Sequence, residues 1–268
     1  MAELCEAERR ELIAVANALA DAARAPALAR FRSRDLAVED KGAGTFDPVT
    51  EADRAVEAAM RATLAIRRPQ DAILGEEMAA REGESGLTWV LDPIDGTRAY
   101  MSGAPTWGVL VAVVDAGGPL FGVIDQPWTG ERFWGGFGAA AMRGPRGEER
   151  LATRATGALA GATLYTTYPD LGSPGETAAF AALASRVRLT RYGFDCYAYA
   201  LLAAGHVDLV VEAGLQPYDV AAPIAVIEAA GGIVTDWQGG PAAGGGRVLA
   251  AGNTALHAVA LEVLSQAG

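Results

Sequence analysis

The stretch that decides the fold reads Trp-Val-Leu-Asp-Pro-Ile-Asp-Gly-Thr over residues 89–97. Its apolar first half is typical of a buried strand, and its second half supplies two carboxylates, a glycine and a hydroxyl. Pro93 has a fixed φ and favours an extended conformation for Asp92. Gly96 lets the backbone approach a ligand closely. If a helix or turn begins there, the amides of Gly96 and Thr97 can bind a phosphate.

Further carboxylates follow other predicted strand ends. Glu76 comes after the apolar residues 72–74, and Asp219 opens a helix after an acidic strand end at Glu212. Loops at the ends of rigid strands can bring such side chains to one point, where they repel one another and take up protons unless cations neutralise them. Oxygen ligands without His or Cys favour Mg²⁺ over zinc or copper. The pattern therefore indicates a magnesium site.

Taken singly, these acidic residues have simpler explanations. A lone Asp92 or Asp95 is usually a solvated surface residue. Asp219 could be a helix N-cap, and Asp53 could be the acidic half of a capping box. What favours a site is that carboxylates, glycine and hydroxyl occur together in residues 89–97.

Bulk composition narrows the class of protein. The chain has 268 residues, 51% of them hydrophobic, which suits one large domain or two packed lobes. A net charge of −11 argues against a nucleic-acid backbone or an anionic membrane surface as partner. Two distant cysteines, Cys5 and Cys196, indicate neither a disulfide framework nor a zinc site, and two histidines leave little for a His-based triad.

The N-terminus lacks the basic-then-apolar layout of a signal peptide. We also expect no apolar run long enough to span a membrane. The expectation is a soluble cytoplasmic protein.

Two helices are expected first. Apolar residues at helical spacing predict a helix over about residues 3–24. Thr50 begins a second, with Asp53 as its capping-box partner. The buried stripe predicted for this second helix is Val56, Met60 and Leu64.

Strands and hairpins follow. Residues 72–74 and 88–91 are predicted strands, and residues 106–114 and 120–125 are predicted to form a hairpin around Gly117 and Gly118. The charged, glycine-containing residues 142–150 are predicted to be a surface loop.

The second half predicts alternating strands and helices. Strands are expected near residues 163–167, 187–191, 208–212 and 232–236, and helices near residues 176–185, 195–205 and 219–230. A last strand is expected over residues 247–251. Asn253 would cap a closing helix with Leu256, Val259 and Val263 on its apolar face.

Four motifs resemble signatures of the inositol monophosphatase family. They are residues 47–53, 75–77, 89–97, and 217–222 with 228–232, in the family's order and spacing over about residues 40 to 236. The resemblance implies an α+β fold, a layered αβαβα sandwich. It also implies a single domain over residues 1–268, with approximate lobes at residues 1–140 and 141–268.

The resemblance also implies a site with two or three Mg²⁺ ions. One ion would be held by Glu76, Asp92 and the backbone carbonyl of Ile94, and a second would be shared by Asp92, Asp95 and Asp219.

Catalytic roles are implied in the same way for Glu76, Asp92, Thr97 and Asp53. Thr97 would pair with Asp53 or Glu76 to orient the attacking water, which the metal activates. The amides of Gly96 and Thr97 would bind the phosphate, and Lys41 lies near the position of a lysine on the family's early loop. Such a phosphomonoesterase needs no covalent phosphoenzyme.

Residues outside the metal site resemble the histidinol-phosphate phosphatase branch, which takes part in histidine biosynthesis. They are residues 98–103, 106–108, 125–127, 193–200 and 205–212. Histidinol phosphate carries an ammonium and an imidazole, whose nitrogens Asp195 and Glu212 could bind. Such charge-assisted hydrogen bonds contribute about 1.5–3 kcal/mol each. Glu212 does not discriminate, because inositol enzymes carry a glutamate there too, and Asp195 could instead be a helix N-cap.

Two residues depart from the branch pattern. Phe194 stands where a small residue is usual and could narrow or reshape the pocket. Pro223 is expected in the first turn of the helix opened by Asp219. Arg98 could pair with an acidic neighbour or reach a partner subunit.

Other functions stay open. The chain could be an inositol-1-phosphate or broad sugar-phosphate monophosphatase, a regulatory protein on the same fold, or an α/β scaffold with scattered acids. No nucleic-acid or membrane partner is expected, and a homodimer is expected from the family alone.

Overall fold

The computed structural model describes residues 4–36, 38–40 and 48–265. Lys41 and Asp47 lie outside the described residues, so the expectations for the early loop stay predictions. Two short strands, β1 (Val38–Asp40) and β2 (Pro48–Thr50), pair antiparallel on either side of this gap.

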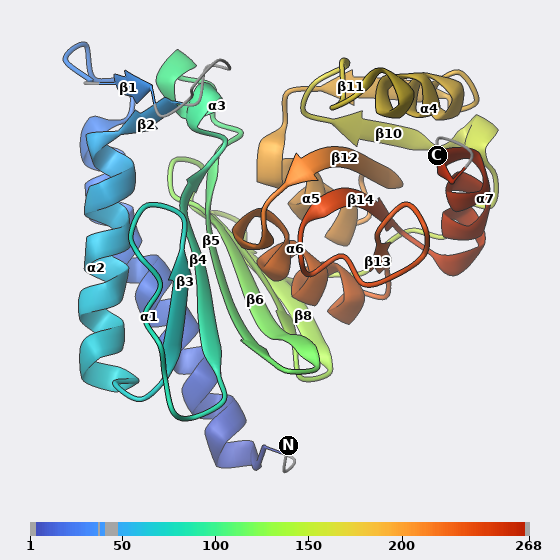
Figure 1. Cartoon of the computed structure of the whole chain (residues 1–268). Helices are drawn as coiled ribbons and strands as arrows, with labels where there is room; N and C mark the ends of the chain where they lie inside the picture. The colour runs from blue at the N-terminus through green and yellow to red at the C-terminus, as the bar shows by residue number, and fades with distance from the viewer. Residues whose placement is uncertain (1–3, 37, 41–47, 266–268) are drawn as a thin grey trace.

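Five layers stack across the molecule, as Figure 1 shows from left to right. Helices α1 (Glu6–Arg30) and α2 (Glu51–Arg67) cover the outer face of a seven-stranded sheet. Helices α5 (Asp195–Ala203) and α6 (Pro217–Ala229) pack between this sheet and a five-stranded one. On the far side lie α4 (Pro174–Ala184) and α7 (Thr254–Leu264). The predicted αβαβα sandwich is confirmed.

The seven-stranded sheet has the order β3-β4-β5-β6-β7-β8-β9. Only β3 and β4 run parallel, and every other neighbouring pair is antiparallel. The strands are Ala72–Gly75, Thr88–Asp95, Gly108–Asp115, Gly118–Gln126, Glu131–Gly136, Ala139–Gly144 and Gly147–Arg150.

The five-stranded sheet has the order β11-β10-β12-β14-β13. Its β10 runs parallel to both neighbours, and β14 is antiparallel to both of its own. The strands are β10 (Thr163–Thr166), β11 (Leu189–Tyr192), β12 (Leu209–Leu215), β13 (Ile233–Thr235) and β14 (Gly246–Ala251). A short 3-10 helix, Leu159–Gly161, precedes β10.

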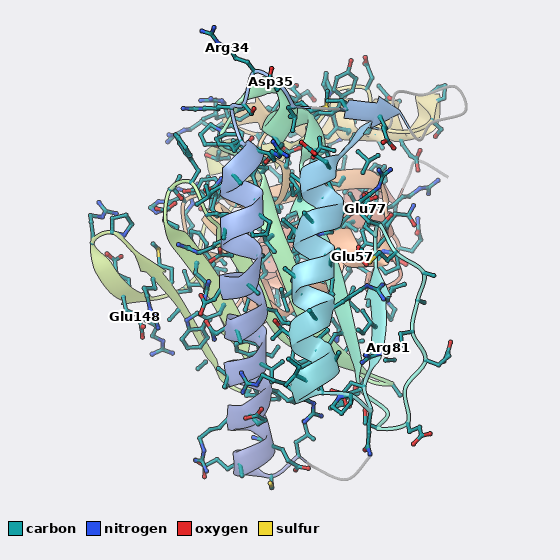
Figure 2. All side chains as sticks on the ribbon, turned by 90° about the vertical axis from the view of Figure 1, so that its left-hand side faces the viewer. Arg34, Asp35, Glu57, Glu77, Arg81 and Glu148 are labelled. Carbon is teal, nitrogen blue, oxygen red and sulfur yellow. The ribbon has the colours of Figure 1, made fainter. Side chains whose placement is uncertain are left out.

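The prediction of a loop over residues 142–150 is wrong. This segment forms most of the hairpin of β8 and β9, which extends from the edge of the sheet and carries Glu148 (Figure 2). All four residues of β9 are exposed, so the strand shows no apolar alternation. A strand is recognised in a sequence by that alternation, so β9 could not be predicted. Strand β7 was not predicted either.

Helix α1 is longer than predicted. It continues through Pro26 to Arg30, although proline cannot donate to the carbonyl one turn earlier. Ala23 and Ala27 are fully buried on either side of the proline, so packing maintains the helix. By length and composition α1 could cross a membrane, which corrects the expectation that no apolar run is long enough. In the fold its apolar face packs against α2 and the sheet.

Helix α6 packs closely on the first sheet. A Cβ atom on Gly122 would lie 2.5 Å from the carbonyl oxygen of Ala222, and one on Gly135 would lie 2.6 Å from the Cα of Val226. Both glycines therefore allow backbone-to-backbone contact. Pro223 is buried at this contact in the second turn of α6, because the helix begins at Pro217 and not at Asp219 as predicted.

Two smaller predictions also need correction. The final helix is capped by Asn253 as expected, but Val259 is 45% exposed, and His257 and Ala260 are buried with Leu256 and Val263. The predicted lobe boundary after residue 140 falls inside β8, and the division into lobes stays a prediction.

Candidate active site

The site is built on the end of β4. In a regular strand, residues three apart point to opposite faces. Asp92 and Asp95 would therefore point to opposite faces of a regular strand. The register of β4 with β5 shifts between these two residues, and the shift breaks the alternation of side chains between the two faces. Gly96 then adopts a φ of +83°, which ends the strand and starts the short helix α3 (Thr97–Ser102). The motif thus turns sharply where its carboxylates lie.

Helix α6 brings the third carboxylate from a distant part of the chain. One oxygen from each of Asp92, Asp95 and Asp219 lies within 4.8 Å of the others. Asp219 is the third residue of α6, and its Oδ2 accepts a hydrogen bond of 2.7 Å from the amide of Gln216. The alternative explanation of Asp219 as the N-cap is therefore wrong: Gln216 holds that position, and Asp219 is the acidic partner of its capping box and also joins the cluster.

The negative charges of the clustered carboxylates repel one another, which makes ionisation of each less favourable. Burial and the charges of Glu76, Asp95, Asp219 and Asp53 raise the pKa of Asp92 well above its usual range. Burial and the charge of Asp219 raise the pKa of Asp95, and burial raises that of Asp219 to about 6. Since β3 and β4 are parallel, Glu76 emerges at the same edge of the sheet as Asp92.

Asp53 has one oxygen bound and one free. Its Oδ2 accepts hydrogen bonds from the amide and hydroxyl of Thr50, so the predicted capping box is confirmed. Its Oδ1 is buried and has no hydrogen-bond partner within the described residues. A buried acceptor normally has a partner, and a cation or water ordered by the cluster would supply one. All the donors are oxygens, so these residues fit a hard divalent metal ion.

Thr97 and Ile94 are held next to the cluster. The hydroxyl of Thr97 donates to the carbonyl of Ile94 over 3.2 Å, and the amide of Ile94 donates to Asp92 Oδ1 over 3.0 Å. The two residues that the resemblance assigns to metal and water binding are therefore hydrogen-bonded around the same turn.

A cavity of about 720 Å³ opens beside the cluster. It brings together four carboxylates that the sequence singled out, Asp95, Asp195, Glu212 and Asp219. The other lining residues are Arg98, Thr167, Tyr168, Asp170, Leu171, Gly172, Cys196, Tyr199, Ala213, Gly214 and Leu215. The loop over residues 167–172 was missed, although its position directly after a predicted strand could have indicated it.

Asp195 lies directly against the Gly96 turn. A Cβ atom on Gly96 would lie 2.7 Å from the carboxyl carbon of Asp195, and Thr106 donates its hydroxyl to Oδ2 over 3.2 Å. Burial raises the pKa of Asp195 to about 6, while the Thr106 bond and the nearby Arg98 guanidinium lower it. Arg98 thus has an acidic neighbour in its own chain.

The alternative explanation of Asp195 as an N-cap is wrong. It is the first residue of α5, it has a φ of +46°, and the capping position belongs to Phe194. A non-glycine residue with positive φ is strained, and such strain is concentrated at functional sites. The next amide, of Cys196, donates to Asp95 Oδ2 over 2.6 Å and ties α5 to the cluster.

Phe194 does not narrow the cavity. Its ring packs on Tyr165, with 4.6 Å between ring centroids, and under the guanidinium of Arg191. Among the described residues it is not one that lines the cavity.

Glu212 is buried and held by three hydrogen bonds. Its carboxylate accepts from the amide of Thr167 over 2.6 Å, from the Thr167 hydroxyl over 2.9 Å and from the Thr166 hydroxyl over 3.2 Å. Burial outweighs these bonds and raises the pKa of Glu212 to about 7. Two aromatic residues in this part of the fold differ in their exposure to the cavity. Trp107 is fully buried, whereas the buried Tyr199 also lines the cavity.

Comparison with known proteins agrees with this geometry. The model of the inositol monophosphatase family matches residues 8–268. The chain is 42% identical to a bifunctional phosphatase IMPL2 of the Arabidopsis thaliana chloroplast, over 98% of this chain and 77% of that protein. It is 37% identical to a histidinol-phosphatase of Streptomyces coelicolor, over 94% and 96% of the two chains. A solved inositol monophosphatase from Zymomonas mobilis superposes with a TM-score of 0.84 at 40% identity, over 96% of this chain and 98% of that one.

The chain therefore belongs to the inositol monophosphatase family. It is a phosphoric monoester hydrolase, of a family that is generally metal-dependent.

Proposed function

We propose that this chain is a Mg²⁺-dependent phosphatase that hydrolyses histidinol phosphate to histidinol and phosphate. The observation that carries the proposal is the position of Asp195, between the Gly96 turn and the cavity. An anionic pocket suits a substrate that carries an ammonium and an imidazole beside its phosphate. The similarity to a histidinol-phosphatase supports the same choice.

In the proposed mechanism, the metal would be held by Asp92, Asp95, Asp219, Glu76 and the Ile94 carbonyl. Bound there, Mg²⁺ would offset the negative charge of the phosphoryl oxygens and would lower the pKa of water.

Thr97 and the free Oδ1 of Asp53 orient the attacking water. The water oxygen bonds to phosphorus and the water gives up a proton, the ester P–O bond breaks, and the leaving oxygen takes up a proton, so that no proton is gained or lost overall. The amides of Gly96 and Thr97 bind the phosphoryl oxygens. Asp195 and Glu212 accept hydrogen bonds from the substrate's nitrogens.

A second candidate is an inositol-1-phosphate or broad sugar-phosphate monophosphatase. It is favoured by the Zymomonas mobilis structure, an inositol monophosphatase at 40% identity. The metal site would be the same, and only the contacts to the alcohol would differ. A cytoplasmic location and a homodimer stay predictions.

The test measures phosphate release from histidinol phosphate and inositol 1-phosphate, each with Mg²⁺ and with EDTA. We expect Mg²⁺-dependent preference for histidinol phosphate. Asp195→Asn should lower kcat/KM for histidinol phosphate about 10–100-fold, because one charge-assisted bond is lost, and should affect inositol 1-phosphate less.

The matched control is Asp115→Asn, a carboxylate in the β5–β6 turn that accepts from the Gly117 amide. It should behave as the unmodified enzyme. Equal losses on both substrates in Asp195→Asn would contradict the proposed specificity, and hydrolysis undiminished by EDTA would contradict the metal requirement.

A further inference from the structure

The segment that carries Glu76 leaves the edge of the first sheet. Strand β3 ends at Gly75, and the chain bends through residues 76–78 before returning to pair with the strand. Arg81 and Ile73 exchange backbone hydrogen bonds of 2.8 and 2.9 Å. Because β3 is an edge strand, the sheet holds this loop from one side only. Its conformation therefore depends on contacts from elsewhere.

Helix α2 supplies such contacts through a buried glutamate, Glu57. Its Oε2 accepts a hydrogen bond of 2.7 Å from the amide of Glu77. Its Oε1 accepts one of 2.7 Å from Nε of Arg61, whose other end donates to the carbonyl of Met78 over 3.1 Å. Figure 2 shows Glu57 on α2 beside Glu77 on the loop. Two side chains of one helix thus bind two successive residues of the loop.

Gly75 is needed for this arrangement. A Cβ atom there would lie 2.1 Å from Oε1 of Glu57 and 2.5 Å from its carboxyl carbon. The glycine therefore leaves space for the carboxylate beside the end of β3, and an alanine would displace one or the other.

Stability alone is a weak reason for this ion pair. The Glu57 side chain is fully buried and that of Arg61 is 17% exposed. Removing two charges from water costs about as much as their attraction returns, so apolar residues of similar volume would stabilise the fold equally well. What a buried, hydrogen-bonded pair adds is a fixed geometry for the backbone that it binds.

We propose that Glu57 is a positioning residue for the metal site. It holds residues 75–78 so that the carboxylate of Glu76 faces Asp92. The parallel register pairs Gly75 with Leu91, so Glu76 and Asp92 follow side by side at the same edge of the sheet, which agrees with this orientation. The inference rests on the proposed function, because it takes Glu76 to be a metal ligand.

The test is the variant Glu57→Gln, with Mg²⁺ binding measured by titration calorimetry in the absence of substrate. Glutamine keeps the size of the side chain but presents an NH₂ group to one of the two donors, so one hydrogen bond is lost. Partners that orient metal ligands typically contribute 10–100-fold in metal affinity. We expect the dissociation constant for Mg²⁺ to rise about 10–100-fold, and activity to recover largely at high Mg²⁺.

The matched control is Asp71→Asn, a buried carboxylate at the other end of β3. Asp71 accepts 2.6 Å and 2.9 Å hydrogen bonds from Arg68 and from the indole of Trp89. Its loss should lower the Tm as much as Glu57→Gln does, and should leave the Mg²⁺ dissociation constant unchanged.

A lowered Tm with unchanged Mg²⁺ affinity in Glu57→Gln would overturn the inference, because Glu57 would then act on stability alone. An unmodified protein that binds no Mg²⁺ would overturn the proposed metal site and this inference with it. If Glu57→Gln does not fold, Gly75→Ala serves instead, since its methyl group forces apart the Glu57 carboxylate and the end of β3. The same weakening of Mg²⁺ binding is expected, and unchanged binding would overturn the inference.

Discussion

At the scale of single residues, Asp92 combines two opposed requirements. Its carboxylate accepts a hydrogen bond from the amide of Ile94 and so shapes the turn. The same carboxylate is buried beside the negative charges of Glu76, Asp95 and Asp219. Without a cation, ionising Asp92 is unfavourable, and its pKa rises accordingly. The residue serves function at the expense of stability, which is usual for active sites.

We therefore expect Asp92→Asn to affect thermal stability and phosphatase activity differently. The asparagine oxygen can still accept the Ile94 amide, so the metal-free variant should unfold at the same or a higher temperature than the unmodified protein. Phosphatase activity should fall at least about 100-fold, because a charged metal ligand is lost. Calorimetry and a phosphate-release assay measure the two effects. Near-normal turnover would defeat the assignment of Asp92.

At the scale of elements, α2 carries much of the site on one face. Thr50 caps it, Asp53 occupies its first turn, and Glu57 follows one turn later on the same side. The predicted stripe of Val56, Met60 and Leu64 is fully buried beside them. The same helix thus packs the core and positions carboxylates, and a change in its cap should affect both.

Thr50→Ala tests this coupling. The Thr50 hydroxyl accepts a hydrogen bond of 3.1 Å from the amide of Ala52 and donates one to the carboxylate of Asp53. Loss of the cap should cost about 1 kcal/mol, or about 2–4 °C in Tm. Asp53 loses a partner, so the Mg²⁺ concentration for half-maximal activity should also rise.

Two further variants serve as controls for the cap. Thr50→Ser should retain both properties. Asn253→Ala removes the cap of α7, where Oδ1 accepts the Leu256 amide over 2.9 Å. It should lower the Tm alone. A rise in the Mg²⁺ requirement in this variant as well would show that any destabilised helix affects the site.

At the scale of the whole molecule, the acidic site joins the first sheet to α5, α6 and the second sheet. Its charges repel one another across this junction, so metal-free stability should depend on pH. Burial raises the pKa of Glu212 to about 7, from 4.5 for an unshifted glutamate. A carboxyl group whose pKa is raised in the folded state stabilises the fold while it is protonated. This contribution is fully present below the pKa of the unfolded state and is lost as the pH rises through the pKa of the folded state.

The Tm in EDTA should therefore fall as the pH increases from about 4.5 to 7, with Glu212 contributing about 3 kcal/mol. Glu212→Gln should flatten that slope. Mg²⁺ at about 100 times its dissociation constant should add about 2.7 kcal/mol at neutral pH. Scanning calorimetry across pH, with and without Mg²⁺, measures all three. A Tm insensitive to Mg²⁺ would contradict a metal site at this junction.

Several parts of the fold and site could be predicted from local sequence. The Thr50 capping box, the strand leading into residues 89–97 and the Asn253 cap depend on neighbours within a few positions, and the structure confirms them. The helix through Pro26 and the exposed strand β9 could not be predicted. Packing against other elements overrides the proline, and pairing with β8 defines the strand.

The sequence by itself determined the chemistry of this protein. Four ordered motifs contain the carboxylates, the glycine turn and the hydroxyl, because ligand types and turn residues are local properties of the chain. Only the tertiary structure decided which groups meet. It placed Asp195, whose φ is positive, against Gly96. It also brought Asp219 close to the carboxylates of β4 and Glu57 into contact with the loop that carries Glu76. Those contacts join residues far apart in the chain, and no local pattern encodes the packing of helices and sheets that brings them together.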